Sequence, residues 1–152
     1  MKRKAIVIDI DGVCLQTDFI LDEIHKLGLK GEEKWEYFYE HCNSDKVLRM
    51  KGAIELFRQF SNSGNAPYIF FSTARNEKCK EATLNKLWKE GFIIPDDAIF
   101  MRSYYDLRPA HEVKCEHLLK IMEEFDVIAF IDDDLQNCEI AKSLGILSLR
   151  RV

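Results

Sequence analysis

The sequence predicts an α/β fold in which a parallel β-sheet is covered by helices on both faces. Short apolar runs rich in β-branched and aromatic residues alternate along the chain with longer amphipathic segments. Several of the amphipathic segments stop at a glycine, which is a common helix terminator. Strands that alternate with helices are joined by right-handed crossovers. Such crossovers make the strands parallel and place the helices on the faces of the sheet.

Each element of this fold has its own signal. The first strand is an apolar run over residues 4–10, and its composition predicts a central place in the sheet. Similar runs predict further strands over 68–71, 98–101, 127–131 and 146–149. Apolar residues at helical spacing predict helices over 18–28, 32–42, 51–63, 76–90, 109–125 and 135–144.

A chain of 152 residues has the length of one domain, which is expected to span residues 1–152. Within it, residues 14–50 leave room for a small helical flap or cap, and for nothing larger. The longest apolar runs are of strand length, so neither a membrane span nor a signal peptide is expected. Five cysteines without framework spacing predict reduced thiols in a cytoplasmic protein.

Acidic residues follow two of the predicted strands at the point where each strand ends. Asp9 and Asp11 close the first strand, and a run of acids that begins with Asp132 and Asp133 closes the strand over 127–131. Carboxylates at the tips of buried strands are costly unless a cation lies among them. Because ligands of parallel sheets bind beyond the carboxyl ends of the strands, these acids should line one pocket. Oxygen-only ligands favour Mg²⁺ over zinc.

Each of these residues also has a commoner structural explanation. An Asp-x-Asp pair is often a turn or a helix cap, and Thr73, which follows the second strand, suits the N-cap of the next helix. Lys114, on an amphipathic helix, would ordinarily be solvated. Asp134 is expected to be a structural cap of the helix that follows it. A functional site is favoured only by the joint placement of the remaining residues at one edge of the sheet: Asp9, Asp11, Thr73, Lys114, Asp132 and Asp133.

The pattern as a whole resembles the haloacid dehalogenase (HAD) superfamily. The likeness rests on Asp9-x-Asp11-Gly12, a threonine ending the second strand, a lysine before the fourth and two aspartates ending the fourth. It covers nearly the whole chain in the expected order. It implies a three-layer Rossmann-like sheet. It also implies a phosphohydrolase, because phosphohydrolases are the commonest members of this superfamily.

The resemblance implies a role for each acid. Asp9 would attack phosphorus and form an aspartyl-phosphate, and Asp11 would protonate the leaving group and then activate water. Mg²⁺ would be held by the Asp9 carboxylate, the main-chain carbonyl of Asp11 and Asp132, and Asp133 would support this shell.

Three further side chains are expected near the phosphoryl group. Thr73 would offer its hydroxyl, and Lys114 would supply positive charge to the transferring group. Arg75 has two equally weighted interpretations, a contact with a substrate phosphate or a pair with a surface acid.

Other conspicuous residues are expected to be structural. Trp35 and Trp88 lie at helical spacing among apolar residues, which predicts that both pack in the core. His111, Cys115 and His117 resemble a metal cluster only superficially, because no matching second pair exists, and they are interpreted as incidental.

A narrower resemblance concerns the substrate. Met101-Arg102, Asp106-Leu107-Arg108-Pro109 and Val113-Lys114 resemble a segment of the phosphatase domain of phage-type polynucleotide kinases. This resemblance implies removal of a 3′-phosphate from a nucleic-acid end, and the absence of a large lid suits so bulky a substrate. The kinase loop G-x-x-x-x-G-K-[ST] is absent, which implies a stand-alone phosphatase.

Two alternatives remain open. The first is a nucleotidase or another small-molecule phosphatase that uses the same residues. The net charge of −4 argues against a protein held to nucleic acid mainly by bulk electrostatics, although it does not exclude an enzyme that engages only a terminus. The second is a catalytically idle binding module, which the intact set of motif residues disfavours.

Overall fold

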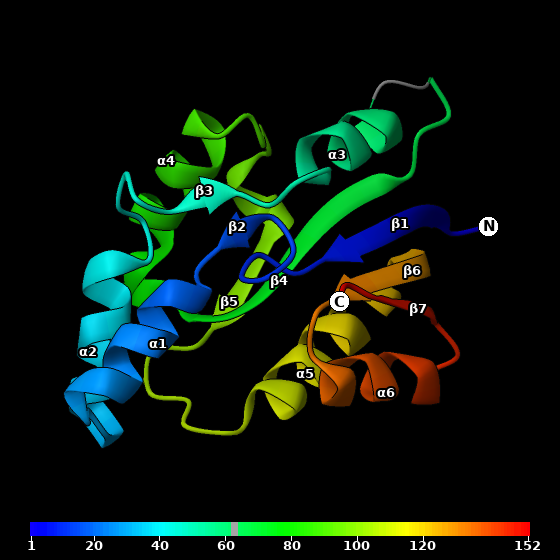
Figure 1. Cartoon of the computed structure of the whole chain (residues 1–152). Helices are drawn as coiled ribbons and strands as arrows, with labels where there is room; N and C mark the ends of the chain where they lie inside the picture. The colour runs from blue at the N-terminus through cyan, green and yellow to red at the C-terminus, as the bar shows by residue number, and fades with distance from the viewer. Residues whose placement is uncertain (62–63) are drawn as a thin grey trace.

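Five parallel strands form the central sheet of the computed structural model, which describes residues 1–61 and 64–152 (Figure 1). The order of the strands is β5-β4-β1-β6-β7, and all four pairings between neighbours are parallel. The strands are β1 (Arg3–Ile8), β4 (Tyr68–Asn76), β5 (Ile99–Arg102), β6 (Phe125–Asp132) and β7 (Leu147–Arg150). The predicted α/β fold with a central first strand is confirmed.

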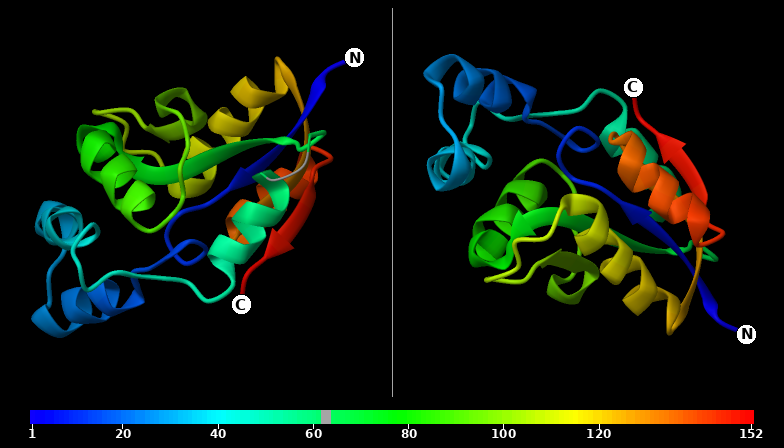
Figure 2. Two further views of the ribbon diagram at one scale, coloured as in Figure 1. Left: turned by 90° about the horizontal axis from the view of Figure 1, so that it is seen from above. Right: turned by 90° about the horizontal axis from the view of Figure 1, so that it is seen from below.

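Helices cover both faces of this sheet, which gives three layers (Figures 1 and 2). In Figure 1 two helices lie above the sheet, α3 (Ala53–Ser61) and α4 (Lys80–Lys89). Two more, α5 (Ala110–Met122) and α6 (Leu135–Ser143), lie below it and contact each other. Right-handed crossovers explain the division, because the chain moves along the sheet in one direction from β1 to β5 and in the other from β5 to β7.

Neighbouring phenylalanines of β4 anchor the two faces. Successive side chains of a strand point to opposite sides of the sheet. Phe71 packs with Phe57 of α3 at a ring-centroid distance of 6.2 Å. Phe70, one residue earlier, packs with Phe125 at 4.9 Å and with Phe100 at 5.7 Å. Apolar material therefore lies on both sides of the central strands, which is why their sequences are continuous apolar runs.

The second strand is longer than the predicted 68–71, because β4 continues to Asn76, which pairs with Arg102 of β5. The helix predicted from residue 76 begins instead as a 3₁₀ turn, Glu77–Cys79. The side chain of Asn76 caps this turn by accepting a hydrogen bond from the backbone N–H of Lys78 at 3.0 Å. Thr73 therefore lies inside a strand, and its interpretation as a helix cap is wrong.

The helix predicted over 51–63 is α3, and residues 62–63 of that span lie outside the described residues.

The segment between β1 and α3 forms an insert at one end of the molecule (Figure 2). It contains α1 (Asp18–Leu27) and α2 (Gly31–His41), which the sequence predicted. Its two ends are joined by an antiparallel ribbon of β2 (Leu15–Gln16) and β3 (Leu48–Arg49). Strands of two residues are too short to show a periodic pattern, so the sequence did not predict the ribbon. A small flap over 14–50 stays a prediction.

The two tryptophans are not core residues, and this prediction was wrong. Trp35 is 49% exposed and Trp88 is 42% exposed. Both lie at the border of the apolar face of their helices, and the core positions are taken by Phe38 and Leu87. Helical spacing alone does not separate the centre of an apolar face from its border.

Among the residues described, no helix is long and apolar enough to cross a membrane.

Candidate active site

Three carboxylates meet at the carboxyl edge of the sheet. Asp9 follows β1 and Asp132 ends β6, and these strands are neighbours, with Ile8 paired to Ile131. Oxygen atoms of Asp9, Asp132 and Asp133 all lie within 4.8 Å of one another. Asp9 is 5% exposed and Asp132 is fully buried. The convergence predicted from the two acid-ended strands is therefore present.

Lys114 of α5 lies inside this cluster. Its Nζ is 2.7 Å from Oδ1 of Asp9 and 2.6 Å from Oδ2 of Asp132, and the side chain is buried. Burial opposes a charge on this lysine, but the attraction of the two carboxylates outweighs it and raises the pKa of Lys114 above its ordinary value. Lys114 is therefore a buried ammonium and not the solvated residue that its helix alone would suggest.

Burial raises the pKa of Asp9 well above its ordinary value. Lys114 opposes this shift, whereas the nearby carboxylates of Asp132 and Asp11 reinforce it. One ammonium thus faces two buried carboxylates, and an added cation would relieve the repulsion between them. The donor set of Asp9, Asp132 and Asp133 consists of carboxylate oxygens only, which fits Mg²⁺. The Asp11 side chain is outside this set, and its carboxylate is paired with Arg75.

Hydrogen bonds from residues at the start of α6 fix the carboxylate of Asp132. The backbone N–H of Asp134 donates to Oδ1 of Asp132 at 2.9 Å, and Nδ2 of Asn137 lies 3.3 Å from both carboxylate oxygens. Asp134 in turn caps α6, because its side chain accepts a hydrogen bond from the backbone N–H of Asn137 at 3.0 Å. This confirms the structural cap predicted for Asp134. The cap also fixes the position of a carboxylate in the cluster.

Gly12 makes room for Asp133. Its φ is +81°, a left-handed conformation that L side chains rarely adopt. A Cβ built on Gly12 would lie 2.0 Å from Oδ2 of Asp133, which is far inside any permitted contact. The glycine of Asp9-x-Asp11-Gly12 therefore allows the first acid-ended strand and the second to approach each other closely.

Arg75 holds Asp11 in a bidentate pair. Its Nε donates to Oδ2 of Asp11 at 3.0 Å and its Nη2 donates to Oδ1 at 2.7 Å. The remaining N–H groups donate to Oδ1 of Asn43 at 2.6 Å, Oγ1 of Thr83 at 3.2 Å and the carbonyl of Cys42 at 3.3 Å. A guanidinium has five N–H donors, and all five are used here. In this arrangement Arg75 has no donor left for a phosphate, and its acid is Asp11, not an acid elsewhere on the surface.

Arg75 also connects three parts of the molecule. It is 2% exposed and lies in β4, while Thr83 belongs to α4. Cys42 and Asn43 belong to the end of the insert, just after α2. The guanidinium therefore ties Asp11 both to the core and to the insert. No local sequence pattern could have predicted these contacts, because the partners are far apart along the chain.

Thr73 lies in β4 at the carboxyl edge of the sheet. It is two residues beyond Phe71, which pairs with Ile8, the last residue of β1. Thr73 is buried, and its Oγ1 accepts a hydrogen bond from the backbone N–H of Arg75 at 3.1 Å. Thr73 is thus placed at the same edge as the carboxylates, as predicted.

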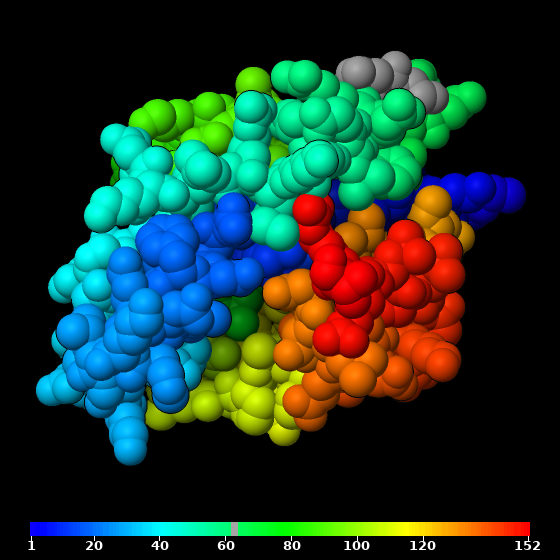
Figure 3. All heavy atoms as spheres, viewed as in Figure 1, coloured from blue at the N-terminus to red at the C-terminus, as the bar shows by residue number. Residues whose placement is uncertain are grey.

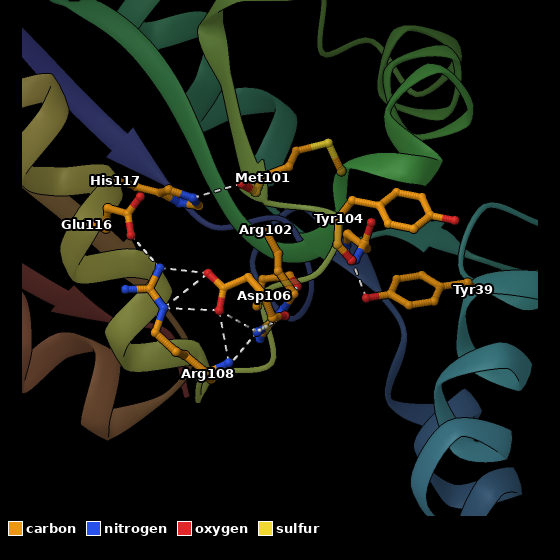
Figure 4. A network of polar contacts seen from close by, with 10 residues as sticks. Tyr39, Met101, Arg102, Tyr104, Asp106, Arg108, Glu116 and His117 are labelled. Atoms are coloured by element: carbon orange, nitrogen blue, oxygen red, sulfur yellow. Dashed lines mark hydrogen bonds and ion pairs between the residues drawn. The ribbon is translucent and has the colours of Figure 1, made fainter.

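His117 has a structural position. Its Nε2 lies 3.0 Å from the carbonyl of Met101 (Figure 4). Its Nδ1 lies 2.8 Å from Oγ of Ser72, so His117 links α5 to two strands. Burial lowers the pKa of His117 to about 4. Among the described residues, the aspartate cluster is the only group found that could hold a metal ion, so the helix histidines and Cys115 do not form a metal site.

The position of His117 predicts a pH-dependent stability. Between pH 6.5 and about 4 the unfolded chain binds a proton at His117 and the folded chain does not, so the free energy of unfolding falls as the pH is lowered. A shift of this size corresponds to about 3 kcal/mol. His117→Gln should therefore be less acid-sensitive than the parent when urea unfolding is compared at pH 7.5 and 4.5. The exposed His25→Gln is the control. A stability difference between parent and His117→Gln that is the same at both pH values would contradict the prediction.

A pocket of about 710 Å³ opens next to Asp11, between α2 and the loop that follows β5. In Figure 3 a recess is visible between the insert (blue) and the start of α6 (orange), with green atoms at its floor. The pocket is lined by Asp11, Glu32, Trp35, Glu36, Phe38, Tyr39, residues 74–76, Lys78, Arg102, Tyr104 and residues 106–110. A small molecule, or the end of a polymer chain, therefore has access to the carboxyl edge of the sheet, where the aspartates lie.

A scan against protein-family models matches the HAD superfamily, subfamily IIIB (acid phosphatase), over residues 1–145. A search of the curated proteins finds no match.

Solved structures share the fold. The class C acid phosphatase from Bacillus anthracis has a TM-score of 0.71 at 20% identity, over 90% of this chain and 53% of that chain. A chain of the Pnkp1/Rnl/Hen1 RNA repair complex has a TM-score of 0.76 at 17% identity, over 99% and 42% of the two chains. A HAD family enzyme from Bacteroides thetaiotaomicron, in complex with magnesium and inorganic phosphate, has a TM-score of 0.57 at 12% identity, over 99% and 94%. This chain thus spans about half of the length of the first two.

Proposed function

Because the chain belongs to the HAD superfamily, subfamily IIIB (acid phosphatase), we propose that it is a Mg²⁺-dependent phosphomonoesterase. The observation that carries the proposal is the meeting of Asp9, Asp132 and Asp133 around the buried ammonium of Lys114. This cluster lies at the carboxyl edge of the sheet, where ligands of such folds bind. Asp9, Asp132 and Asp133, with the main-chain carbonyl of Asp11, would hold the metal. When bound, Mg²⁺ would supply positive charge that reduces the repulsion between the phosphate and the carboxylates.

In the proposed first step, a carboxylate oxygen of Asp9 forms a bond to phosphorus while the bond from phosphorus to the leaving oxygen breaks. Asp11, after one of its oxygens has left the pair with Arg75 and taken up a proton, donates that proton to the leaving oxygen, so the alcohol departs neutral. In the second step Asp11 takes a proton from water, and the resulting hydroxide displaces Asp9 from phosphorus. Inorganic phosphate leaves, and both carboxyl groups return to their starting forms.

The other side chains bind the group that is transferred. Lys114, held between Asp9 and Asp132, would contact the phosphoryl oxygens and stabilise the charge that builds up on them. Thr73, two residues beyond the pairing of Phe71 with the end of β1, would offer its hydroxyl. For Arg75 we propose a positioning role in place of the phosphate contact considered from the sequence, because its five donors are used by other partners.

The role of Arg75 is testable through the leaving group. Arg75→Lys keeps the charge and loses the bidentate pair with Asp11, so proton transfer to the leaving oxygen should suffer. We expect kcat for an alkyl phosphate to fall about 100-fold, and kcat for an aryl phosphate with a good leaving group to fall much less, with KM unchanged. Lys86→Gln, which alters another buried cation paired with Glu90, is the matched control. Equal losses on both substrates would show that Arg75 only supports the fold.

The substrate that we propose is a 3′-phosphorylated nucleic-acid end. The segment over residues 101–114 supports this through its resemblance to phage-type polynucleotide kinases, and the similar fold found in an RNA repair complex agrees with it. A nucleotidase is the alternative, which the net charge of −4 favours.

We further propose that residues 14–50 act as a small flap. The protein would work in the cytoplasm, in keeping with its five free cysteines.

Phosphate release from a matched panel tests these proposals. The panel contains 3′- and 5′-phosphorylated oligonucleotides, 3′- and 5′-mononucleotides and an aryl phosphate, each with and without Mg²⁺, and Asp9→Asn as the inactive control. Preference for the 3′-phosphorylated oligonucleotide is expected. Better turnover of the mononucleotides than of the oligonucleotides would favour the nucleotidase over an enzyme that acts on nucleic-acid ends. No Mg²⁺-stimulated release from any member would overturn the phosphatase proposal itself.

A further inference from the structure

An apolar hollow of about 230 Å³ lies on the face of the sheet that carries α3, between this helix and the edge strand β7. Its floor is a row of three residues that pair with one another across neighbouring strands: Ile8 of β1, Ile131 of β6 and Leu149 of β7. One wall is α3, which contributes Phe57. The hollow is separate from the pocket next to Asp11, because the two share no lining residue.

The face of β7 that borders the hollow is uncovered in the described part of the chain. Leu147 is 62% exposed and Leu149 is 46% exposed, and residues two apart in a strand point to the same face. Parallel sheets are normally covered on both faces, so these leucines mark a place where the cover is missing. Leu56 of α3, which also lines the hollow, is exposed as well. An apolar ligand would remove this surface from water.

Two guanidinium groups border the hollow, and neither is paired with a carboxylate of the described residues. Nε of Arg150 donates to the carbonyl of Asp133 at 3.1 Å, and Nη2 of Arg151 donates to the carbonyl of Lys51 at 2.7 Å. Both acceptors are neutral backbone groups, so they do not balance the charges of the arginines. A guanidinium has five N–H donors, and each arginine therefore keeps donors for a further acceptor.

These features select the chemistry of a ligand. Apart from the two arginines and the thiol of Cys14, the side chains that line the hollow are hydrocarbon. A peptide or a sugar there would leave polar groups without hydrogen bonds, whereas an alkyl chain has no such groups. A dry cavity of about 150 Å³ holds one benzene-sized molecule, so a volume of about 230 Å³ suits a chain of roughly six to eight carbons. The planar guanidiniums match a carboxylate as its head group.

We propose that the hollow binds a medium-chain fatty acid, with the alkyl chain between α3 and β7 and the carboxylate on Arg150 and Arg151. The floor residues Ile8 and Ile131 directly precede acids of the aspartate cluster, so the ligand lies beside the strand ends that carry the cluster and outside the cluster itself. Because the fatty acid removes apolar surface of the folded chain from water, its binding should stabilise the fold.

Calorimetric titration with octanoate tests the site. In metal-free buffer, and below the concentration at which octanoate forms micelles, it should bind at one site and raise the melting temperature. Butanoate has the head group without the long chain, and octanol has the chain without the charge, so both should bind at least about 10-fold more weakly. Equal affinity for octanol would show that the arginines take no part, and equal affinity for butanoate would show the same of the hollow. Either result would overturn the proposal.

Variants locate the ligand. Arg150→Gln together with Arg151→Gln should weaken octanoate binding at least about 10-fold. Leu56→Trp, which adds bulk to the hollow from an exposed position of α3, should abolish it. The matched controls are Arg58→Gln, at another exposed position of α3, and Leu119→Trp, at an exposed position of α5, and both should bind octanoate like the parent. Unchanged binding in both the double arginine variant and Leu56→Trp would place octanoate elsewhere and refute the site.

Other occupants give different results. Pairing of β7 with β7 of a second copy would add further arginines to this edge without an acid, which disfavours a dimer here. A ligand-free dimer that appears in sedimentation and is broken by Leu149→Lys would nevertheless assign the edge to a second copy and overturn the proposal. Tighter binding of acetyl-glycyl-leucine than of octanoate would overturn it in favour of a peptide end. Octanoate binding needs no turnover, so failure of the phosphatase proposal would leave this site in place.

Discussion

Replacing Asp9 by asparagine is expected to reduce phosphate release about 10,000-fold or more and to leave the fold intact. An asparagine amide has no carboxylate oxygen that can form the acyl-phosphate bond, so covalent catalysis is lost, and losses of nucleophiles have effects of this order. The fold should persist because Lys114 keeps its contact with Asp132 at 2.6 Å. The variant also removes a buried carboxyl group whose charged form burial disfavours, so its melting temperature should equal or exceed that of the parent.

The measurement is single-turnover and steady-state phosphate release together with thermal unfolding. Asp45→Asn, which breaks an exposed pair with Lys89, is the control and should keep full activity. Rapid mixing of the parent with substrate should trap a phosphorylated protein that is absent from the variant. Turnover above about 1% in both Asp9→Asn and Asp9→Ala would exclude Asp9 as the nucleophile.

The sequence predicted the acidic edge because two simple rules apply there. Apolar runs mark buried strands, and parallel strands bring their carboxyl ends to one edge. Asp9, Asp132 and Asp133 therefore had to converge if the fold class was right, and they lie within 4.8 Å of one another. Lys114 followed from its place in the superfamily pattern. Its helix gave no reason to expect a buried ammonium.

The contacts of Arg75 show what sequence reasoning could not reach. Its partners Asp11 and Asn43 are 64 and 32 residues away along the chain. Asp11 approaches it through the pairing of β1 with β4, and Asn43 approaches it because the insert folds back over β4. The separation of two residues along the chain does not show that the insert packs against β4. The same limit explains Trp35, since helical spacing indicates an apolar face but not whether a neighbouring segment covers its border. In both cases the missing information is how the insert packs on the core.

Lys114→Met should lower stability as well as turnover. The ammonium lies 2.7 Å from Asp9 and 2.6 Å from Asp132, and both acids are buried, so its removal leaves two carboxylates without their shared partner. Breaking a buried pair in this way costs about 3–5 kcal/mol. Turnover should fall about 1,000-fold, because the charge that stabilises the transferring group is lost. Urea unfolding and phosphate release measure the two effects, and Lys120→Met, at an exposed position of the same helix, is the control.

A double variant separates charge imbalance from lost packing. If repulsion between Asp9 and Asp132 causes the instability of Lys114→Met, then adding Asp9→Asn removes one of the two charges and should restore part of the lost free energy of unfolding. Mg²⁺ should also stabilise Lys114→Met more than the parent, because a cation among the carboxylates replaces the missing charge. A double variant that is as unstable as the sum of its single changes would show that the two residues act independently. The buried ammonium would then not be what holds the acidic edge together.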